Sequence, residues 1–161
     1  MSEKKVVIEY TVFDGPEKLD QTGRQLLDLA MEASRKAYSP YSKFRVGAAL
    51  LLADDSIVTG SNQENAAYPS GICAERVAIF YASSQKPGVA YRRMAIVAPD
   101  SPAGSEFPIS PCGACRQVLA EYEGMQQDPL EIILWDGKGS IWMFKGIAQL
   151  LPFYFSAGSL G

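Results

Sequence analysis

Pro-Cys-Gly-Ala-Cys, at residues 111–115, decides how this chain folds together with a second stretch, Cys-Ala-Glu at residues 73–75. The cysteines of the two stretches indicate one shared metal site, which would bring both stretches together. The Cys-x-x-Cys pair stands where a loop leads into a predicted helix, so both sulfurs can reach one metal ion. A third thiolate from Cys73 would leave one corner of a tetrahedral site open, which is the pattern of a catalytic zinc site. We therefore predict that Cys73, Cys112 and Cys115 ligate zinc.

The cysteine count agrees with this prediction. The chain has three cysteines and no histidine. An odd number of cysteines argues against a disulfide framework and favours metal ligands, free thiols or a nucleophile. Without histidine there is no imidazole ligand and no Ser/His/Asp or Cys/His machinery. The chemistry must therefore depend on thiolates, carboxylates, amides and lysines.

Two charged residues follow Cys73 directly. Glu75 is two residues from a ligand, so its carboxylate can face the open corner and act as general acid and base. Arg76 is predicted to donate hydrogen bonds to the sulfurs, because three thiolates around Zn²⁺ leave an excess negative charge. The simpler alternatives are a structural zinc knuckle or redox pair for the cysteines, a solvated helix-start residue for Glu75 and a surface ion pair for Arg76.

Apolar periodicity and turn residues predict an α/β chain with the order α-β-β-α-β-α-β-β-α. We expect a three-layer α-β-α sandwich, with a central mixed sheet of five strands and helices on both faces. Residues 1–17 are predicted to be an N-terminal extension or edge segment, and residues 18–161 a single domain. The predicted helices are 19–37, 73–82, 112–123 and 147–151, and the predicted strands are 46–53, 57–59, 93–98, 131–135 and 140–144.

Charge and hydrophobicity exclude other classes of partner. The net charge is −3 and no run of Lys and Arg is present, which disfavours a nucleic acid polymer. No apolar stretch approaches the ~20 residues of a membrane span. The N-terminal residues lack the apolar core of a secretory signal, so we expect a cytoplasmic protein with no membrane partner.

Four segments of the chain are informative: 41–50 (Tyr-Ser-Lys-Phe-Arg-Val-Gly-Ala-Ala-Leu), 62–65 (Asn-Gln-Glu-Asn), 71–76 (Gly-Ile-Cys-Ala-Glu-Arg) and 110–117 (Ser-Pro-Cys-Gly-Ala-Cys-Arg-Gln). Pro-Cys-x-x-Cys preceded by Cys-x-Glu is the signature of zinc deaminases. Together, these segments resemble the small homotetrameric, zinc-dependent cytidine deaminases, and the resemblance covers about residues 22 to 155.

The resemblance implies hydrolytic deamination of cytidine, and of deoxycytidine, as a step of pyrimidine salvage. It implies one Zn²⁺ per subunit, Glu75 relaying protons, and a homotetramer with pockets at subunit interfaces. It also implies substrate contacts by six residues: Phe44 on the pyrimidine ring, Asn62 and Glu64 on the ribose hydroxyls, the Ala74 backbone on the ring edge, and Tyr68 and Phe155 closing the pocket from a neighbouring subunit. The run 153–155, Phe-Tyr-Phe, leaves open whether Phe153 or Phe155 closes the pocket.

Three rival functions stand beside this expectation. The first is a related aminohydrolase acting on another cytosine-bearing compound, such as a blasticidin-like nucleoside antibiotic. The second is a non-catalytic, zinc-stabilised binding protein. The third, editing of a polynucleotide, would require a basic groove.

Overall fold

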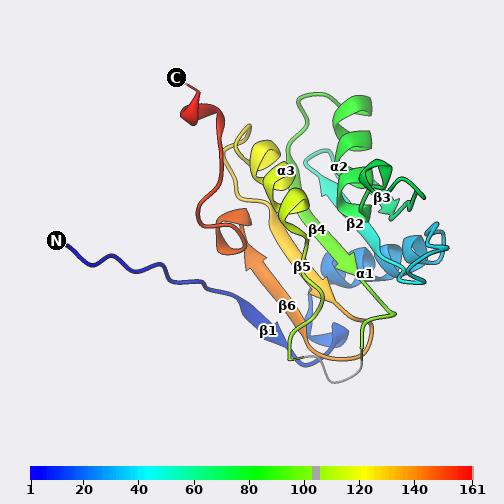
Figure 1. Ribbon diagram of the computed structural model, residues 1–161. Helices are drawn as coiled ribbons and strands as arrows, with labels where there is room; N and C mark the ends of the chain where they lie inside the picture. Colours follow the sequence, from blue (N-terminus) through cyan, green and yellow to red (C-terminus); the bar gives the residue numbers. More distant parts are fainter. Residues whose placement is uncertain (103–105, 161) are drawn as a thin grey trace.

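A computed structural model describes residues 1–102 and 106–160 (Figure 1). One mixed sheet forms the centre, with strand order β1-β6-β5-β4-β2-β3. Strands β4 and β5 are parallel, and all other neighbours are antiparallel. The strands are β1 (Thr11–Phe13), β2 (Gly47–Leu52), β3 (Ile57–Ser61), β4 (Tyr91–Val97), β5 (Glu131–Trp135) and β6 (Ile141–Lys145).

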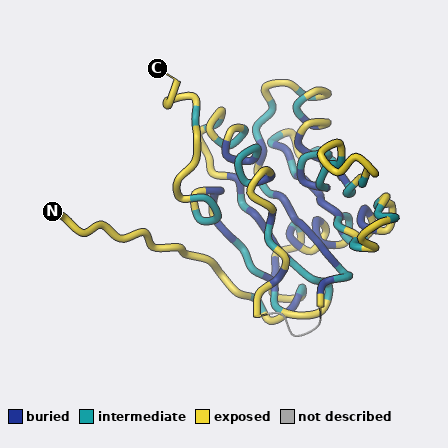
Figure 2. The backbone as a smooth tube through the Cα atoms, viewed as in Figure 1, coloured by how far each residue is buried: buried dark blue, intermediate teal, exposed yellow. Residues whose placement is uncertain are grey.

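The α/β class and the mixed sheet are confirmed, but the predicted number of strands is wrong. The sheet has six strands because β1 pairs with β6, with Val12 opposite Trp142. The predicted extension thus contributes an edge strand, and the residues before β1 run away from the sheet as an exposed arm (Figures 1 and 2). Tyr10 stacks on Trp142 with 4.4 Å between ring centroids, which holds the base of the arm against β6.

Helices cover both faces of the sheet. Helix α1 (Gln21–Ser34) packs on one face through Leu26, Leu27 and Ala30, whereas α2 (Ala74–Gln85) and α3 (Gly113–Glu123) cover the other. Alternation along the strands supplies both cores, because Ala48 and Leu50 face α2 while Ala49 faces α1. The three predicted layers are therefore present.

The predicted ends of several elements differ from the observed ones. Helix α1 begins at Gln21 instead of residue 19, because Asp20 is its N-cap and accepts a hydrogen bond from Gly23 N at 2.6 Å. The predicted last helix at 147–151 is only a short 3₁₀ turn, Ile147–Gln149. Further 3₁₀ turns are Pro16–Lys18, Tyr68–Ser70 and Ala157–Ser159. In the described part of the chain, no helix has the length and apolarity needed to cross a membrane.

A close approach between β3 and α2 fixes where α2 begins. A Cβ on Gly60 of β3 would lie 2.5 Å from Ala74 O and 2.7 Å from Ala78 N. Both atoms belong to the helix backbone and cannot move independently, so only glycine allows this contact. The strand therefore holds the first turn of α2 at a fixed distance from the sheet.

Candidate active site and metal centre

Two helix N-termini carry the predicted metal ligands. Cys73 is the N-cap residue of α2, and Cys112 is the N-cap residue of α3, both with extended backbone. Cys115 lies in the first turn of α3 and is fully buried. Unpaired N–H groups and the helix dipole favour thiolates at such positions. Both helices lie on the same face of the sheet (Figure 1), so their first turns can meet.

The three sulfurs form one cluster. Sγ of Cys112 is 3.9 Å from Sγ of Cys73 and 3.5 Å from Sγ of Cys115, and all three atoms lie within 4.8 Å of one another. Zn–S bonds of ~2.3 Å in a tetrahedron place sulfurs about 3.8 Å apart, so the donor set fits zinc. Among the described residues no carboxylate joins the group, which leaves the fourth position open. Cys112 is exposed and Cys73 is half-buried, so the cluster can be reached from solvent.

The pKa values of the Cys73 and Cys115 thiols are shifted in opposite directions. A hydrogen bond from Cys115, aided by Arg76 and opposed by burial, lowers the pKa of Cys73 to about 5. The pKa of Cys115 is raised, because its thiol donates to Cys73 and because it is buried. Cys73 is therefore the thiolate of this pair at neutral pH, and metal binding must release the proton of Cys115.

Arg76 lies beside the cluster, where the sequence predicts it. Its Nη2 is 3.9 Å from Sγ of Cys73, and its Nε is buried without a hydrogen-bond partner among the described residues. Burial lowers the pKa of Arg76, but the hydrogen bond to Cys73 and the charges of Cys115 and Cys73 outweigh this effect and raise it. The guanidinium is thus a permanent positive charge against the sulfurs.

Glu75 is the buried carboxyl of the site. It is 4% exposed, and within the described chain its Oε2 has no hydrogen-bond partner. Burial, more than the nearby charge of Cys73, raises the pKa of Glu75 to about 7. An unpaired buried carboxyl oxygen is costly and is uncommon outside functional sites. This carboxyl can hold a proton near neutral pH and exchange it with a bound molecule.

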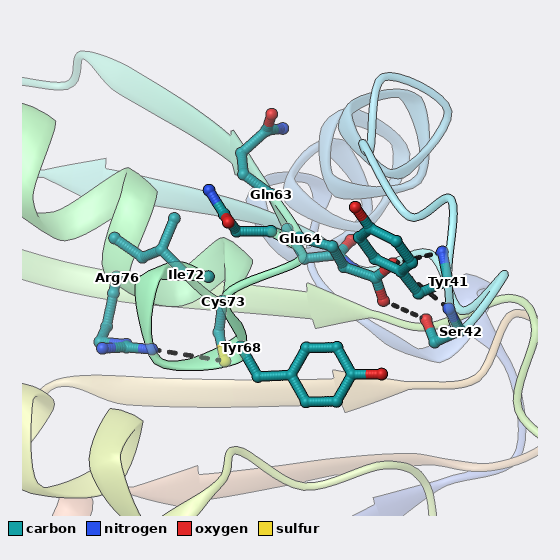
Figure 3. A pocket seen from close by; sticks show the side chains of 11 residues that line it. Tyr41, Ser42, Gln63, Glu64, Tyr68, Ile72, Cys73 and Arg76 are labelled. Atoms are coloured by element: carbon teal, nitrogen blue, oxygen red, sulfur yellow. Dashed lines mark hydrogen bonds between the residues drawn. The ribbon is translucent and has the colours of Figure 1, made fainter.

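A cavity of about 580 Å³ adjoins the cluster through Cys73, a size that suits a small organic molecule. Figure 3 shows that its wall comes from three loops, which carry Tyr41 and Ser42, Gln63 and Glu64, and Tyr68 to Cys73, and from Arg76 in the first turn of α2. Of the six predicted substrate contacts, three line this cavity: Asn62, Glu64 and Tyr68. Tyr68 lines the cavity of its own protomer, whereas the prediction placed it at the pocket of a neighbouring subunit. Lining residues that the sequence reasoning did not select are Tyr41, Ser42, Gln63, Asn65, Gly71 and Ile72. Tyr41 and Ser42 belong to the same segment, 41–50, as Phe44, but only Phe44 was predicted to contact the substrate.

Glu64 and Asn62 line the cavity, and both also form hydrogen bonds with backbone groups. The Glu64 carboxylate accepts hydrogen bonds from the Ser42 hydroxyl and from the backbone N–H of Tyr41 and Ser42. These bonds, the Ser42 hydroxyl first, lower the pKa of Glu64 despite some burial, so it is ionised. Asn62 Oδ1 accepts from Val46 N at 2.8 Å, and Nδ2 donates to Phe44 O at 2.9 Å. An amide nitrogen carries two hydrogens, so one N–H of Asn62 is left for a ligand.

The other three predicted contacts lie elsewhere. Ala74 is buried at the start of α2, next to the cluster. The half-buried Phe44 is outside the set that lines the cavity, and Tyr41 stands there instead. Phe155 is 60% exposed, its carbonyl accepts a hydrogen bond from Gln117 of α3 at 2.7 Å, and it is outside the set that lines the cavity. Within one protomer, Phe155 therefore does not close the cavity.

Comparison with known proteins gives consistent relatives. The family model described as "Cytidine and deoxycytidylate deaminase zinc-binding region" matches residues 20–127. The chain is 44% identical over 137 residues to a cytidine deaminase of Sporosarcina psychrophila, covering 84% of this chain and 93% of the relative. It is 40% identical over 134 residues to a cytidine deaminase of Halalkalibacterium halodurans, covering 83% and 94%.

Solved structures agree with these relatives. The crystal structure of cytidine deaminase from Burkholderia pseudomallei superimposes with a TM-score of 0.71 at 40% identity, covering 81% of this chain and 97% of that one. Cytidine deaminase from Mycobacterium tuberculosis gives a TM-score of 0.63 at 34% identity, covering 86% and 98%. The mixed sheet with helices on both faces is thus shared with these proteins.

Proposed function

Because this chain belongs to the family of cytidine and deoxycytidylate deaminases, we propose that it hydrolyses cytidine to uridine and ammonia at the Cys73, Cys112 and Cys115 site. The observation that carries the proposal is the unpaired, buried Oε2 of Glu75 beside three clustered sulfurs. An open metal position next to a carboxyl whose pKa is about 7 is the arrangement that hydrolytic deamination needs. Zinc, the metal in the family's description, suits the three sulfurs.

When bound, zinc supplies the Lewis acidity that makes water a nucleophile near neutral pH. Glu75 would take the first proton of the attacking water and pass it to N3 of the ring. It would then take the second proton, from the hydroxyl group now on C4, and pass it to the departing amine. The C4–N bond breaks, a C4–O bond takes its place, and ammonia leaves with the proton that Glu75 returned. Burial keeps the pKa of Glu75 close to working pH, so it can accept and donate in one cycle.

The remaining residues orient the substrate. Glu64, ionised and fixed by Ser42, and the free N–H of Asn62 are placed to bind ribose hydroxyls in the cavity. The family resemblance assigns Phe44 and the backbone of Ala74 to the pyrimidine ring, although Phe44 does not line the cavity within one protomer. It assigns Tyr68 to closing the pocket of a neighbouring subunit. Arg76 balances the charge of the thiolates. We extend the proposal to deoxycytidine, because it carries the same base and keeps the 3′-hydroxyl for Glu64 and Asn62 to bind.

We also propose a homotetramer in which a neighbouring subunit closes the cavity. Phe153 and Phe155 are 80% and 60% exposed, and neither lines the cavity of its own protomer. Large exposed aromatic side chains at the end of a chain favour an interface. Light scattering on the purified protein should give four times the mass of one chain, and a monomer of full activity would remove this part of the proposal.

The test of the function is a substrate panel run together with metal analysis. The panel contains cytidine, deoxycytidine, free cytosine, a cytosine-bearing nucleoside antibiotic and single-stranded DNA. We expect ammonia release from cytidine and deoxycytidine only, with one zinc per chain. Turnover of the antibiotic with inert cytidine would point to the related aminohydrolase. Zinc content without turnover of any substrate would point to a binding protein.

A further inference from the structure

Arg116 joins three separate points around the second metal ligand. It lies on α3, four residues after Cys112. Its Nε donates to Pro111 O, its Nη2 to Ser110 Oγ and its Nη1 to Leu150 O, each at 2.8 Å. One planar guanidinium therefore connects the residues directly before Cys112 with the segment that follows β6.

The segment before Cys112 is held by side-chain packing, in which Pro108 and Pro111 are buried, and by the contacts of Arg116, but not, in the part of the chain that the structure describes, by hydrogen bonds between backbone groups. Residues 106–111 connect β4 to α3 outside the sheet, and among the described residues they take part in no backbone–backbone hydrogen bond. Pro108 and Pro111 cannot donate one. Cys115 is fully buried, so the surrounding side chains fix its sulfur. Cys112 is exposed, so the position of its sulfur depends mainly on the position of its own backbone.

The Arg116 side chain thus forms a bridge from Ser110 and Pro111 to Leu150. Leu150 is held firmly in place. Its N–H donates to Ile147 O at 2.8 Å, and Ile147 is fully buried. The Glu123 carboxylate at the end of α3 accepts from the N–H of Ile147 and from that of Leu130. The carbonyl of Leu150 is thus fixed to the same helix that carries Arg116, and the bridge has a rigid base.

The three contacts of Arg116 all go to neutral oxygens. No carboxylate in the described part of the chain forms an ion pair with it, in contrast to Arg45 or Arg93. Its contribution is therefore geometric: a fork of donors in fixed directions, which lysine cannot reproduce. Arg76 differs, because its contact is to a sulfur.

We propose that Arg116 is a positioning residue for the metal centre, which fixes Cys112 by holding Ser110 and Pro111 against Leu150. The inference rests on the proposed zinc-dependent function. Outer hydrogen-bond partners of metal ligands typically contribute 10–100-fold in metal affinity or activity. Arg116 lies outside the set that lines the substrate cavity, so it acts on the metal ligand and not on the nucleoside.

The test compares Arg116→Gln and Arg116→Lys with the wild-type protein and with Arg24→Gln. Arg24 is a matched control, since it donates to the carbonyls of Leu19 and Glu17 at the start of α1, away from the cysteines. For each protein, the release of zinc to a chelator, the cobalt(II) spectrum of the exchanged protein, and kcat and KM for cytidine are measured.

We expect both Arg116 variants to release zinc about 10–100-fold faster, to shift the cobalt bands and to lose kcat at nearly unchanged KM. Arg24→Gln should match the wild type in all three. A lowered melting temperature with unchanged zinc release and cobalt spectrum would show a purely structural role and overturn the proposal. Full rescue by lysine would also overturn it, because the fork would then be unnecessary.

Should Arg116→Gln fail to fold, Ser110→Ala removes a single contact, while Arg116 keeps its hydrogen bonds to Pro111 O and Leu150 O. It should release zinc faster, by a smaller factor, and wild-type release would contradict the proposal. Zinc release and the cobalt spectrum do not depend on turnover. If the wild type fails to deaminate cytidine, these two measurements still decide the role of Arg116, so failure of the function and failure of this inference are distinguishable.

Discussion

Arg76 Nη2 and Cys73 Sγ are 3.9 Å apart, across the first turn of α2. A guanidinium here lowers the cost of gathering three thiolates around one divalent ion, because that ligand set is negative overall. Removing the positive charge should therefore weaken the hold on metal.

Arg76→Gln should lose zinc to a chelator about 10–100-fold faster than the wild type, since the side chain binds a ligand sulfur directly. Zinc release at fixed chelator concentration measures the effect. Arg92→Gln is the control, because Arg92 pairs with Asp55 at the surface. Wild-type retention in Arg76→Gln would mean that the two helix N-termini stabilise the thiolates without it.

Glu75→Gln should keep one zinc per chain and lose about 10²–10⁴-fold in kcat, because the amide cannot relay protons. Ammonia release and metal content are measured on the same sample. Glu121→Gln, an exposed change on α3, should leave both unchanged. Normal turnover by Glu75→Gln would exclude this carboxyl as the acid and base.

Glu64→Gln should raise KM for cytidine about tenfold at similar kcat, the equivalent of one lost hydrogen bond to a charged group. The amide can accept through only one oxygen, and Ser42 and Tyr41 compete for it. Steady-state kinetics with cytidine measure the change, with Glu32→Gln on the surface of α1 as control. An unchanged KM would remove Glu64 from the sugar site.

Gly60→Ala should destabilise the protein by about 1–3 kcal/mol or more, because the new methyl would overlap the backbone of α2. Relief by movement of α2 would displace Cys73 and Glu75, so kcat should fall together with the melting temperature. Gly158→Ala, where the nearest atom is 3.6 Å from the added carbon, is the control. Equal melting temperatures for the two variants would refute the prediction.

The contact between Asp100 and Arg45 leads to a prediction about the stability of the protein at acidic pH. Hydrogen bonds with Arg45 lower the pKa of Asp100 from 3.8 to about 2, against a small opposing effect of burial. A depressed folded-state pKa stabilises the protein above the unfolded value, and the gain is lost as pH falls through the folded value. Asp100→Asn should therefore be less stable than the wild type at pH 7, and the difference should shrink between 3.8 and about 2. Denaturant unfolding across this range measures it, and a constant difference would contradict it.

Local patterns predicted most of the fold. The strand Glu131–Trp135 matches its predicted ends, and α2 and α3 begin one residue after the predicted cysteines, which serve as their N-caps. The sixth strand could not be counted in advance, because β1 is stabilised by Trp142 and Ile141, far away in sequence. Three residues, Thr11–Phe13, are too few to show a reliable alternation.

The candidate site, like the fold, has parts that could be predicted from the sequence and parts that could not. The sulfur cluster was predictable, because its residue types and spacing are specific for metal binding. The cavity wall was predictable only in part: Tyr41 and Ser42 are held at it by hydrogen bonds to Glu64, between loops that have no periodic pattern. The bridge of Arg116 to Leu150 likewise depends on a contact across 34 residues.

The origin of the sulfurs on two helices sets the order of assembly. Cys112 and Cys115 are three residues apart and can meet an ion in a nearly unfolded chain, but Cys73 is 39 residues from Cys112. It arrives only when β3 and α2 have docked on the sheet. Tight zinc capture is therefore coupled to tertiary folding, and the metal is retained only by chains in which both helices have reached their places.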